Sequence, residues 1–185
     1  MAGIFESIIS VMKENLDGEP KPPLHVGEVM ALWTLYTMYE EAKSFYGVFL
    51  NITTDLQLKH SVETAKKDTE KAVNLLKEFL KAEGVPLPNA GQQDKPDSNP
   101  SAVPPGVRFT DDEIANFIGV KTAAYISMMA AAIAQSIRTD VAAIFASHMM
   151  EVIKYDAALK SMMIKKGWLK VPPYYLPTGS PRPGS

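Results

Sequence analysis

The sequence predicts an all-α fold, a bundle of four long helices. All fourteen prolines fall in three short zones, residues 20–23, 86–105 and 172–183. The two blocks between these zones, 24–85 and 106–171, contain no proline, and proline disrupts the interior of a helix. Each block is long enough for two helices joined as a hairpin, and its apolar residues recur with helical spacing.

The first block predicts helices over residues 24–50 and 56–83. The apolar side of the first helix contains Val29, Leu32, Leu35, Tyr36, Tyr39, Tyr46 and Leu50, and that of the second contains Leu58, Val62, Ala65, Thr69, Ala72, Val73, Leu76 and Leu80. Thr54 or Asp55 is suited to cap the start of the second helix. Gly84 follows its end, where a glycine often terminates a helix.

The second block predicts helices over residues 110–136 and 139–166. The run Thr110–Glu113 is a capping box that opens the third helix, and Thr139 is a suitable N-cap for the fourth. The third helix is rich in alanine and methionine, so neighbours can approach it closely, as at the centre of a bundle or at a dimer contact. The apolar side of the fourth helix contains Val141, Ile144, Phe145, His148, Val152, Tyr155, Leu159, Met162 and Met163. After Gly167 we expect an extended apolar segment, a clamp, formed by Trp168, Leu169, Val171, Pro172 and Pro173.

Residues 84–108 predict a long crossover between the two hairpins. The segment is polar and proline-rich, with few large apolar side chains, so much of it is expected to be mobile. It is long enough to cross the length of a bundle, about 40 Å for a helix of about 27 residues. A single long connection between two hairpins is the connectivity of a ferritin-like bundle, here in up-down-down-up order. We therefore expect one domain over residues 24–176.

The two ends of the chain are expected to lie outside this domain. Residues 1–23 predict a short amphipathic helix and a linker. The helix is expected to pack on the bundle, with a membrane- or partner-docking role as the alternative. Residues 177–185 are expected to form a disordered tail.

The composition excludes several classes of protein. It is typical of a soluble globular protein, with 46% hydrophobic and 22% charged residues, and the formal net charge of −2 argues against a nucleic-acid partner bound by phosphate neutralisation. Because there is no cysteine, disulfides, thiolate nucleophiles and cysteine-bound metals are excluded. We find neither a signal peptide nor an uninterrupted apolar run of the roughly 20 residues that a transmembrane helix needs, and expect a cytoplasmic protein.

Three His-x-x-Glu pairs account for all three histidines. Residues three apart on a helix project from one side, so each pair can offer an imidazole and a carboxylate to a single ion. The pair His60/Glu63 lies opposite the apolar side of its helix and is expected at the surface. The candidate ligands of a single zinc or iron ion, on the core sides of the first and fourth helices, are His25, Glu28, His148 and Glu151. Di-metal bundles instead use Glu-x-x-His with further carboxylates, so a two-metal site is not expected.

A structural role for His148 is the alternative interpretation. A buried imidazole without a partner costs about 1–3 kcal/mol, so we expect a hydrogen bond to Glu28 or Tyr36. Five tyrosines on the helical sides are interpreted as core residues in preference to a cavity lining or a redox set: Tyr36, Tyr39, Tyr46, Tyr125 and Tyr155. The chain has no phosphate-binding loop, nucleophile elbow or HExxH motif, and no catalytic residues are assigned.

Three segments, in order along the chain, carry a family resemblance. They are Pro23–Val29 with Leu32-Trp33 after it, Pro105–Asp111 before the third helix, and Lys166–Leu169 with Pro172-Pro173 after it. Together they span about residues 20–175 and resemble the DUF3231 family. Members are ferritin-like bacterial proteins, mostly of spore-formers, similar to spore coat protein F and largely without an assigned activity. The resemblance implies a fold and an association with sporulation, but no reaction.

These observations favour a non-catalytic structural protein of the spore-coat type that self-associates as a homo-oligomer, most simply a dimer. Other spore coat proteins are the further partners that this interpretation implies, and the spore coat is its location. A metal-dependent oxidase or metal store built on the two core-side His-x-x-Glu pairs is the first alternative. A carrier of a small apolar ligand between the helices is the second.

Overall fold

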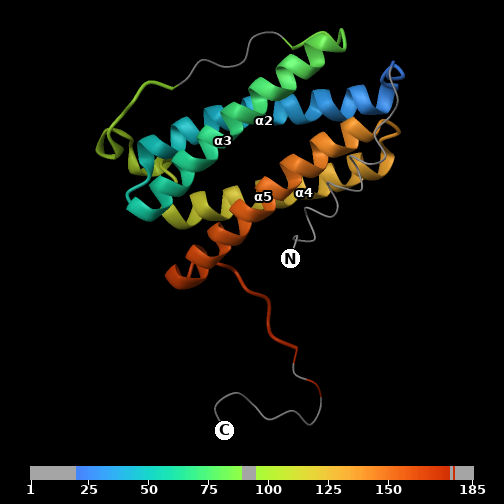
Figure 1. Cartoon of the computed structure of the whole chain (residues 1–185). Coiled ribbons are helices and arrows are strands. Elements are labelled where there is room, and N and C mark those ends of the chain that lie inside the picture. The colour runs from blue at the N-terminus through green and yellow to red at the C-terminus, as the bar shows by residue number, and fades with distance from the viewer. Residues whose placement is uncertain (1–19, 89–94, 176, 178–185) are drawn as a thin grey trace.

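The computed structural model describes residues 20–88, 95–175 and 177, and this part of the chain contains four long α-helices and no strand (Figure 1). The helices are α2 (Val26–Ile52), α3 (Leu56–Ala82), α4 (Asp111–Gln135) and α5 (Thr139–Lys166). Two 3₁₀ turns, η1 (Pro100–Ala102) and η2 (Pro105–Val107), lie in the crossover. The all-α prediction is confirmed. The predicted N-terminal helix and nearly all of the predicted tail lie outside the described residues.

The four helices run up-down-down-up as two antiparallel hairpins, α2–α3 and α4–α5 (Figure 1). At one end of the bundle, the Asp111 carboxylate at the start of α4 accepts hydrogen bonds from the hydroxyls of Thr53 and Thr54, at 2.6 and 2.8 Å. At the other end, Glu83 after α3 pairs with Arg138 before α5, at 2.7 Å. The connection from α3 to α4 therefore crosses the whole length of the bundle, and the ferritin-like order is confirmed.

Local caps set several helix ends at residues that the sequence indicates. Asp55 accepts a hydrogen bond of 2.9 Å from a backbone N–H in the first turn of α3. Thr110 and Glu113 form the expected capping box at the start of α4. Gly84 and Gly167, with φ of 71° and 70°, adopt the left-handed conformation just after α3 and α5, where a side chain would be strained.

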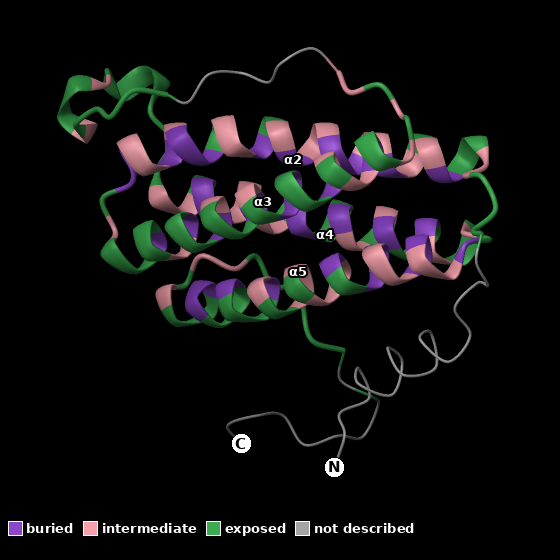
Figure 2. Ribbon diagram, turned by 45° about the horizontal axis from the view of Figure 1, so that its top comes forward, coloured by how far each residue is buried: buried purple, intermediate pink, exposed green. Residues whose placement is uncertain are grey.

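The core consists of two apolar clusters, one towards each end of the bundle. The first includes Leu32, Leu35, Leu76, Leu80, Met129 and Phe145, and the second includes Phe49, Leu58, Val62, Ile114, Ile118, Leu159 and Met163. All eight residues predicted for the apolar side of α3 are buried. Figure 2 shows the buried residues along the inward sides of the helices and the exposed residues on the outward sides.

Two connecting segments differ from what their composition indicates. After α5, Trp168 and Leu169 pack against the second cluster, but Val171 is 52% exposed, so the apolar clamp ends earlier than predicted. In the crossover, the Asn51 side chain donates to the Pro96 carbonyl and accepts from the Ser98 N–H, both at 2.9 Å. These two bonds fasten this part of the crossover to α2, although its composition suggested mobility.

One helix of the described chain meets the length and composition expected of a membrane span. It covers Pro105–Gln135 with a mean hydropathy of 1.6. By length and composition alone this is weak evidence, and 28% of the window is buried inside the bundle, where α4 contributes seven buried residues. The stretch is not an uninterrupted apolar run, because polar residues such as Lys121 and Ser127 interrupt it.

Candidate functional site

His25 and Glu28 form the N-terminal cap of α2. His25 Nδ1 accepts hydrogen bonds from the backbone N–H groups of Gly27 and Glu28, at 3.0 and 3.4 Å. Glu28 Oε2 in turn accepts from the backbone N–H of His25 at 3.1 Å. This reciprocal arrangement is a capping box with histidine in the position usually held by serine or threonine. The three-residue spacing suggested a pair of metal ligands. Instead, it lets the two side chains accept hydrogen bonds from free backbone N–H groups at the start of the helix.

The second carboxylate oxygen of Glu28 caps a different helix. Oε1 accepts hydrogen bonds of 2.8 Å from the backbone N–H groups of Ile137 and Arg138, just before α5. The Glu28 side chain is 2% exposed, so these bonds are shielded from water. The predicted N-cap, Thr139, is wrong: Arg138 occupies the N-cap position and its side chain makes no capping bond. The carboxylate supplied by α2 takes that role.

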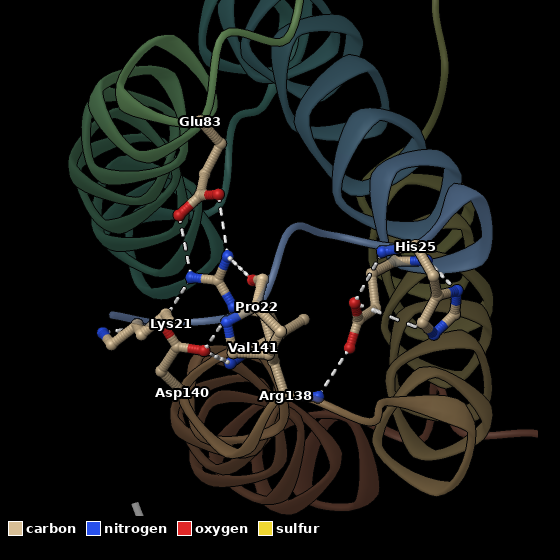
Figure 3. A network of polar contacts seen from close by, with 8 residues as sticks. Lys21, Pro22, His25, Glu83, Arg138, Asp140 and Val141 are labelled. Carbon is tan, nitrogen blue, oxygen red and sulfur yellow. Dashed lines mark hydrogen bonds and ion pairs between the residues drawn. The ribbon is translucent and has the colours of Figure 1, made fainter. Parts of the chain in front are cut away.

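Arg138 is the centre of an ion-pair cluster at the same end of the bundle (Figure 3). Its side chain is only 3% exposed and forms a two-bond pair with Glu83, at 2.7 and 2.8 Å. Asp140 also binds the guanidinium through two bonds, at 3.0 and 2.8 Å, and the Pro22 carbonyl, the third partner, accepts a hydrogen bond of 3.2 Å. Through its bonds to Arg138, and secondarily to Lys21, the pKa of Asp140 falls to about 2. Sequence reasoning missed this cluster.

His148 lies elsewhere, on the inward side of α5. It is nine residues beyond the start of the helix at Thr139, about 13 Å along the axis. Its ring packs edge-on against Tyr39, with 5.9 Å between ring centroids, and Nδ1 lies 4.0 Å from Glu151 Oε2. Burial lowers the pKa of His148, which favours the neutral imidazole.

The hydrogen bond expected from His148 to Glu28 or Tyr36 is wrong. Glu28 is occupied at the end of the bundle, and the Tyr36 hydroxyl donates to Glu40 at 3.2 Å. No hydrogen bond to either ring nitrogen of His148 occurs within the described residues. The residue is 7% exposed, and the Glu151 carboxylate oxygen, 4.0 Å from Nδ1, is the polar group that the ring pairs with.

The two core-side His-x-x-Glu pairs do not meet. His25 and Glu28 stand at a helix start, whereas His148 and Glu151 stand near mid-length of the bundle. Across the described residues, no group of three or more His, Asp or Glu side chains is close enough to hold a metal ion. The third pair, His60/Glu63, is solvent-exposed, with 83% and 52% of the side chains accessible. The four-residue metal site remains a prediction to which this geometry lends no support.

Between the two apolar clusters lies a cavity of about 60 Å³, which we call the tyrosine cavity. All four helices contribute to its wall, which includes Tyr39, Tyr46, Tyr125, Tyr155, Thr69, Thr122, His148, Asp68 and Glu151. Burial raises the pKa of Tyr46 to about 12 and raises those of the other three tyrosines further, so all four phenols stay protonated. The sequence interpretation preferred core packing to a cavity lining; these four tyrosines are buried or partly buried, and they also line a cavity.

A buried carboxylate on α5 also escaped sequence reasoning. Asp156 is 6% exposed, and its Oδ1 accepts a hydrogen bond of 2.7 Å from the Thr122 hydroxyl of α4. Its Oδ2 pairs with Lys160 at 2.6 Å. The signal available was the i,i+4 Asp–Lys spacing, which lets an acid at the edge of the apolar side reach a surface lysine.

The outer side of α4 carries almost no charge. Between Ile114 and Gln135 the only charged residue is Lys121. The exposed positions of this stretch, which we call the α4 outer face, are Val120, Ala123, Ala124, Ser127, Ala130, Ala131 and Ala134. The exposed side of α3, by contrast, carries Lys59, Glu63, Lys67, Lys71, Glu78 and Lys81. The two outward surfaces of the bundle therefore differ sharply in polarity.

Known proteins share this fold. A solved structure of a candidate spore coat protein from Bacillus halodurans C-125 is 32% identical, with a TM-score of 0.81 over 84% of this chain and 97% of that one. A ferritin-like two-domain protein from Anabaena variabilis, which also contains a DJ-1/ThiJ/PfpI-like domain, matches with a TM-score of 0.61 at 14% identity, over 96% of this chain and 53% of that one. The latter likeness concerns the fold alone.

Sequence comparison points the same way. The uncharacterised protein YvdQ of Bacillus subtilis strain 168 is 30% identical over 162 residues, which cover 87% of this chain and 95% of YvdQ. The family model for proteins of unknown function DUF3231 matches residues 13–180. This match includes all three segments that carried the resemblance in the sequence. The chain belongs to the DUF3231 family.

Proposed function

We propose that this protein is a non-catalytic structural component of the spore-coat type, and that it acts by self-association through the α4 outer face. The single observation that carries the proposal is the contrast between this uncharged face and the charged outer side of α3. The partner that we assign to the α4 outer face is a second copy of this chain. The similarity to a candidate spore coat protein supports the spore coat as the place where it acts.

The chemistry of the face suits contact between identical copies. Alanine and serine side chains are short, so two helix backbones can approach closely and pack along their length. Because Lys121 is the only charge between Ile114 and Gln135, two copies meet there with little like-charge repulsion or loss of charge hydration. Exposed Val120 and, just beyond the helix, Ile137 add apolar area at the two ends of the stretch.

Sedimentation velocity of the full chain tests this proposal. We expect a dimer or larger species across the micromolar range, and at least about tenfold weaker association for the double variant Ala123→Glu/Ala130→Glu, since each copy then brings two acids to the contact. The matched control is Asn74→Glu, which adds an acid on the exposed side of α3 and should leave association unchanged. A wild-type protein that stays monomeric at every concentration contradicts the proposal.

Two further measurements separate the alternatives. Co-flotation of the wild-type chain with lipid vesicles, lost in the Ala123→Glu/Ala130→Glu variant, would assign the face to a membrane surface instead of a second copy. A fluorescently tagged copy in sporulating cells should concentrate at the forming spore. Uniform cytoplasmic fluorescence throughout sporulation would contradict the coat role while leaving self-association to be judged by sedimentation.

A further inference from the structure

The electrostatics of the tyrosine cavity favour a positive guest. Two of its wall residues, Asp68 and Glu151, are carboxylates, and no lysine or arginine contributes to the wall. Asp68 is paired with Lys71 at 2.9 Å, so Glu151 contributes more of the net negative charge. The charge of Glu151 reaches inward, because it is one of the causes that raise the pKa of Tyr39. His148 adds no positive charge while burial keeps it neutral.

The aromatic rings of the cavity stand at steep angles to one another. The ring centroids of Tyr39 and Tyr125 are 5.3 Å apart with 59° between the planes. Those of Tyr39 and His148 are 5.9 Å apart with 65° between the planes. Rings set in this way form the corner of a box, and the electron-rich ring faces of tyrosine attract a cation within about 6 Å. Tyr46 and Tyr155 complete the wall.

His148 offers a guest in the cavity a hydrogen-bonding group. Its side chain is more than nine-tenths buried, it lines the cavity, and no hydrogen bond to it exists in the described part of the chain. A guest with a hydroxyl or other hydrogen-bonding arm would give the imidazole the direct hydrogen bond that Glu151, at 4.0 Å, does not provide.

The size of the cavity sets the size of the guest. A volume of about 60 Å³ corresponds to on the order of five water molecules at 10–15 Å³ each. That is room for one compact group of four or five heavy atoms, such as a trimethylammonium head, so a longer arm of the guest must extend towards the opening. Asp68 on α3 and Glu151 on α5 are both exposed and both belong to the wall, so the guest has a route in between these helices.

We propose that the tyrosine cavity binds a small organic cation, a substituted ammonium group with a short hydroxyl-bearing arm. The charged head lies against the rings of Tyr39 and Tyr125, with Glu151 as the nearby carboxylate. The arm hydrogen-bonds to His148. This site is separate from the α4 outer face and does not depend on self-association.

The test compares two probes of nearly the same shape, choline and its neutral isostere 3,3-dimethylbutan-1-ol, by calorimetry and by NMR of the histidine ring protons. We expect choline to bind and to shift the His148 signals but not those of His60, which lies exposed on α3. The neutral isostere should bind about tenfold more weakly, since it lacks the cation–π and carboxylate attraction. Equal affinity for the two probes, or no binding of choline, overturns the proposal.

Variants locate the interaction. Tyr39→Leu removes a ring and should weaken choline binding at least about fivefold, whereas Tyr39→Phe keeps the ring and should stay within about twofold. Glu151→Gln should weaken it about two- to fivefold, and Glu63→Gln, on the exposed side of α3, should have no effect. Equal losses in Tyr39→Phe and Tyr39→Leu would contradict the cation–π contact. A thermal shift with zinc or iron(II) in chelator-stripped protein, together with no shift with choline, would assign the cavity to a metal instead.

Discussion

Glu28 and Arg138 lie 110 residues apart in the sequence, and a hydrogen bond of 2.8 Å from the Arg138 backbone N–H to the Glu28 carboxylate joins them. The same side chain completes the capping box of α2 with His25. One buried carboxylate therefore satisfies free N–H groups at the starts of two helices. It links the first hairpin to the second at the end of the bundle opposite the α2–α3 turn.

Replacing Glu28 with alanine should destabilise the fold by about 3 kcal/mol. The change leaves the part-buried N–H of Ile137 and the buried N–H of Arg138 without an acceptor and removes half of the α2 capping box. Glu28→Gln keeps an acceptor oxygen and should cost about 1–2 kcal/mol. Urea unfolding followed by circular dichroism measures both. The control, Glu63→Gln on the exposed side of α3, should stay within about 0.5 kcal/mol of wild type.

The same variants bear on the metal hypothesis. If Glu28 is a structural cap, its loss lowers stability in metal-free buffer. If it is a metal ligand, Glu28→Gln should match the wild type after chelator treatment and differ only when zinc or iron is added. That second outcome would contradict the capping role and restore His25 and Glu28 as ligands.

Replacing Arg138 with methionine should cost about 3 kcal/mol. The guanidinium is 3% exposed and binds Glu83 and Asp140 through two bonds each, and removing one member of a buried ion pair leaves the others without compensation. The matched control is Lys81→Met, whose partner Glu78 is exposed and whose loss should cost less than about 0.5 kcal/mol. Equal effects in the two variants, measured by urea unfolding, would show that the cluster does not stabilise the fold.

The parts of the fold that sequence predicts well are those set by local chemistry. All the buried residues of α3 could be predicted, because its apolar residues recur with helical spacing and Lys and Glu residues occupy the opposite, solvated side. The Thr110–Glu113 box and the glycines after α3 and α5 act within a few residues of the chain. In α4 the exposed positions are also apolar, so periodicity alone separates its inner from its outer side poorly.

The His-x-x-Glu motif shows why the candidate site was harder to predict from sequence than the fold. The spacing that places two ligands on one side of a helix also places an N-cap residue against position N3. At His25 the signal that distinguishes the two is Pro22-Pro23 just before it, which marks a helix start. No comparable signal reveals the partnership of Arg138 with Glu83, because it depends on how the hairpins pack. Likewise, a helical period shows that tyrosines face inward but not that a cavity lies between them.

Acid should weaken the ion-pair cluster around Arg138 over a defined pH range. The folded-state pKa of Asp140, about 2, lies below its ordinary value of 3.8, so its contribution to stability is complete above about pH 4 and is lost as pH falls from there towards 2. In Arg138→Met the cause of the low pKa is removed, and the unfolding free energy should fall less steeply over this range. The measurement is urea unfolding at a series of pH values. Parallel curves for the two proteins would contradict the assignment.

His148 should make stability depend on pH nearer neutrality. Burial lowers its folded-state pKa below the ordinary 6.5, so below about pH 6.5 the unfolded chain binds the proton more readily and the folded state loses stability. The ring packs against Tyr39 from α2 and lies near Glu151 on its own helix, and it shares the cavity wall with Tyr125 from α4 and Asp68 from α3.

The expected slope is at most about 1.4 kcal/mol per pH unit for one proton, and His148→Gln should remove it while leaving a free energy near the wild-type value above pH 7. His60→Gln, at a site 83% exposed, is the matched control and should keep the slope. Choline at saturation should steepen the wild-type curve, because a bound cation opposes protonation of the neighbouring imidazole. A slope that persists in His148→Gln but disappears in His60→Gln would contradict the burial of a neutral imidazole in the tyrosine cavity.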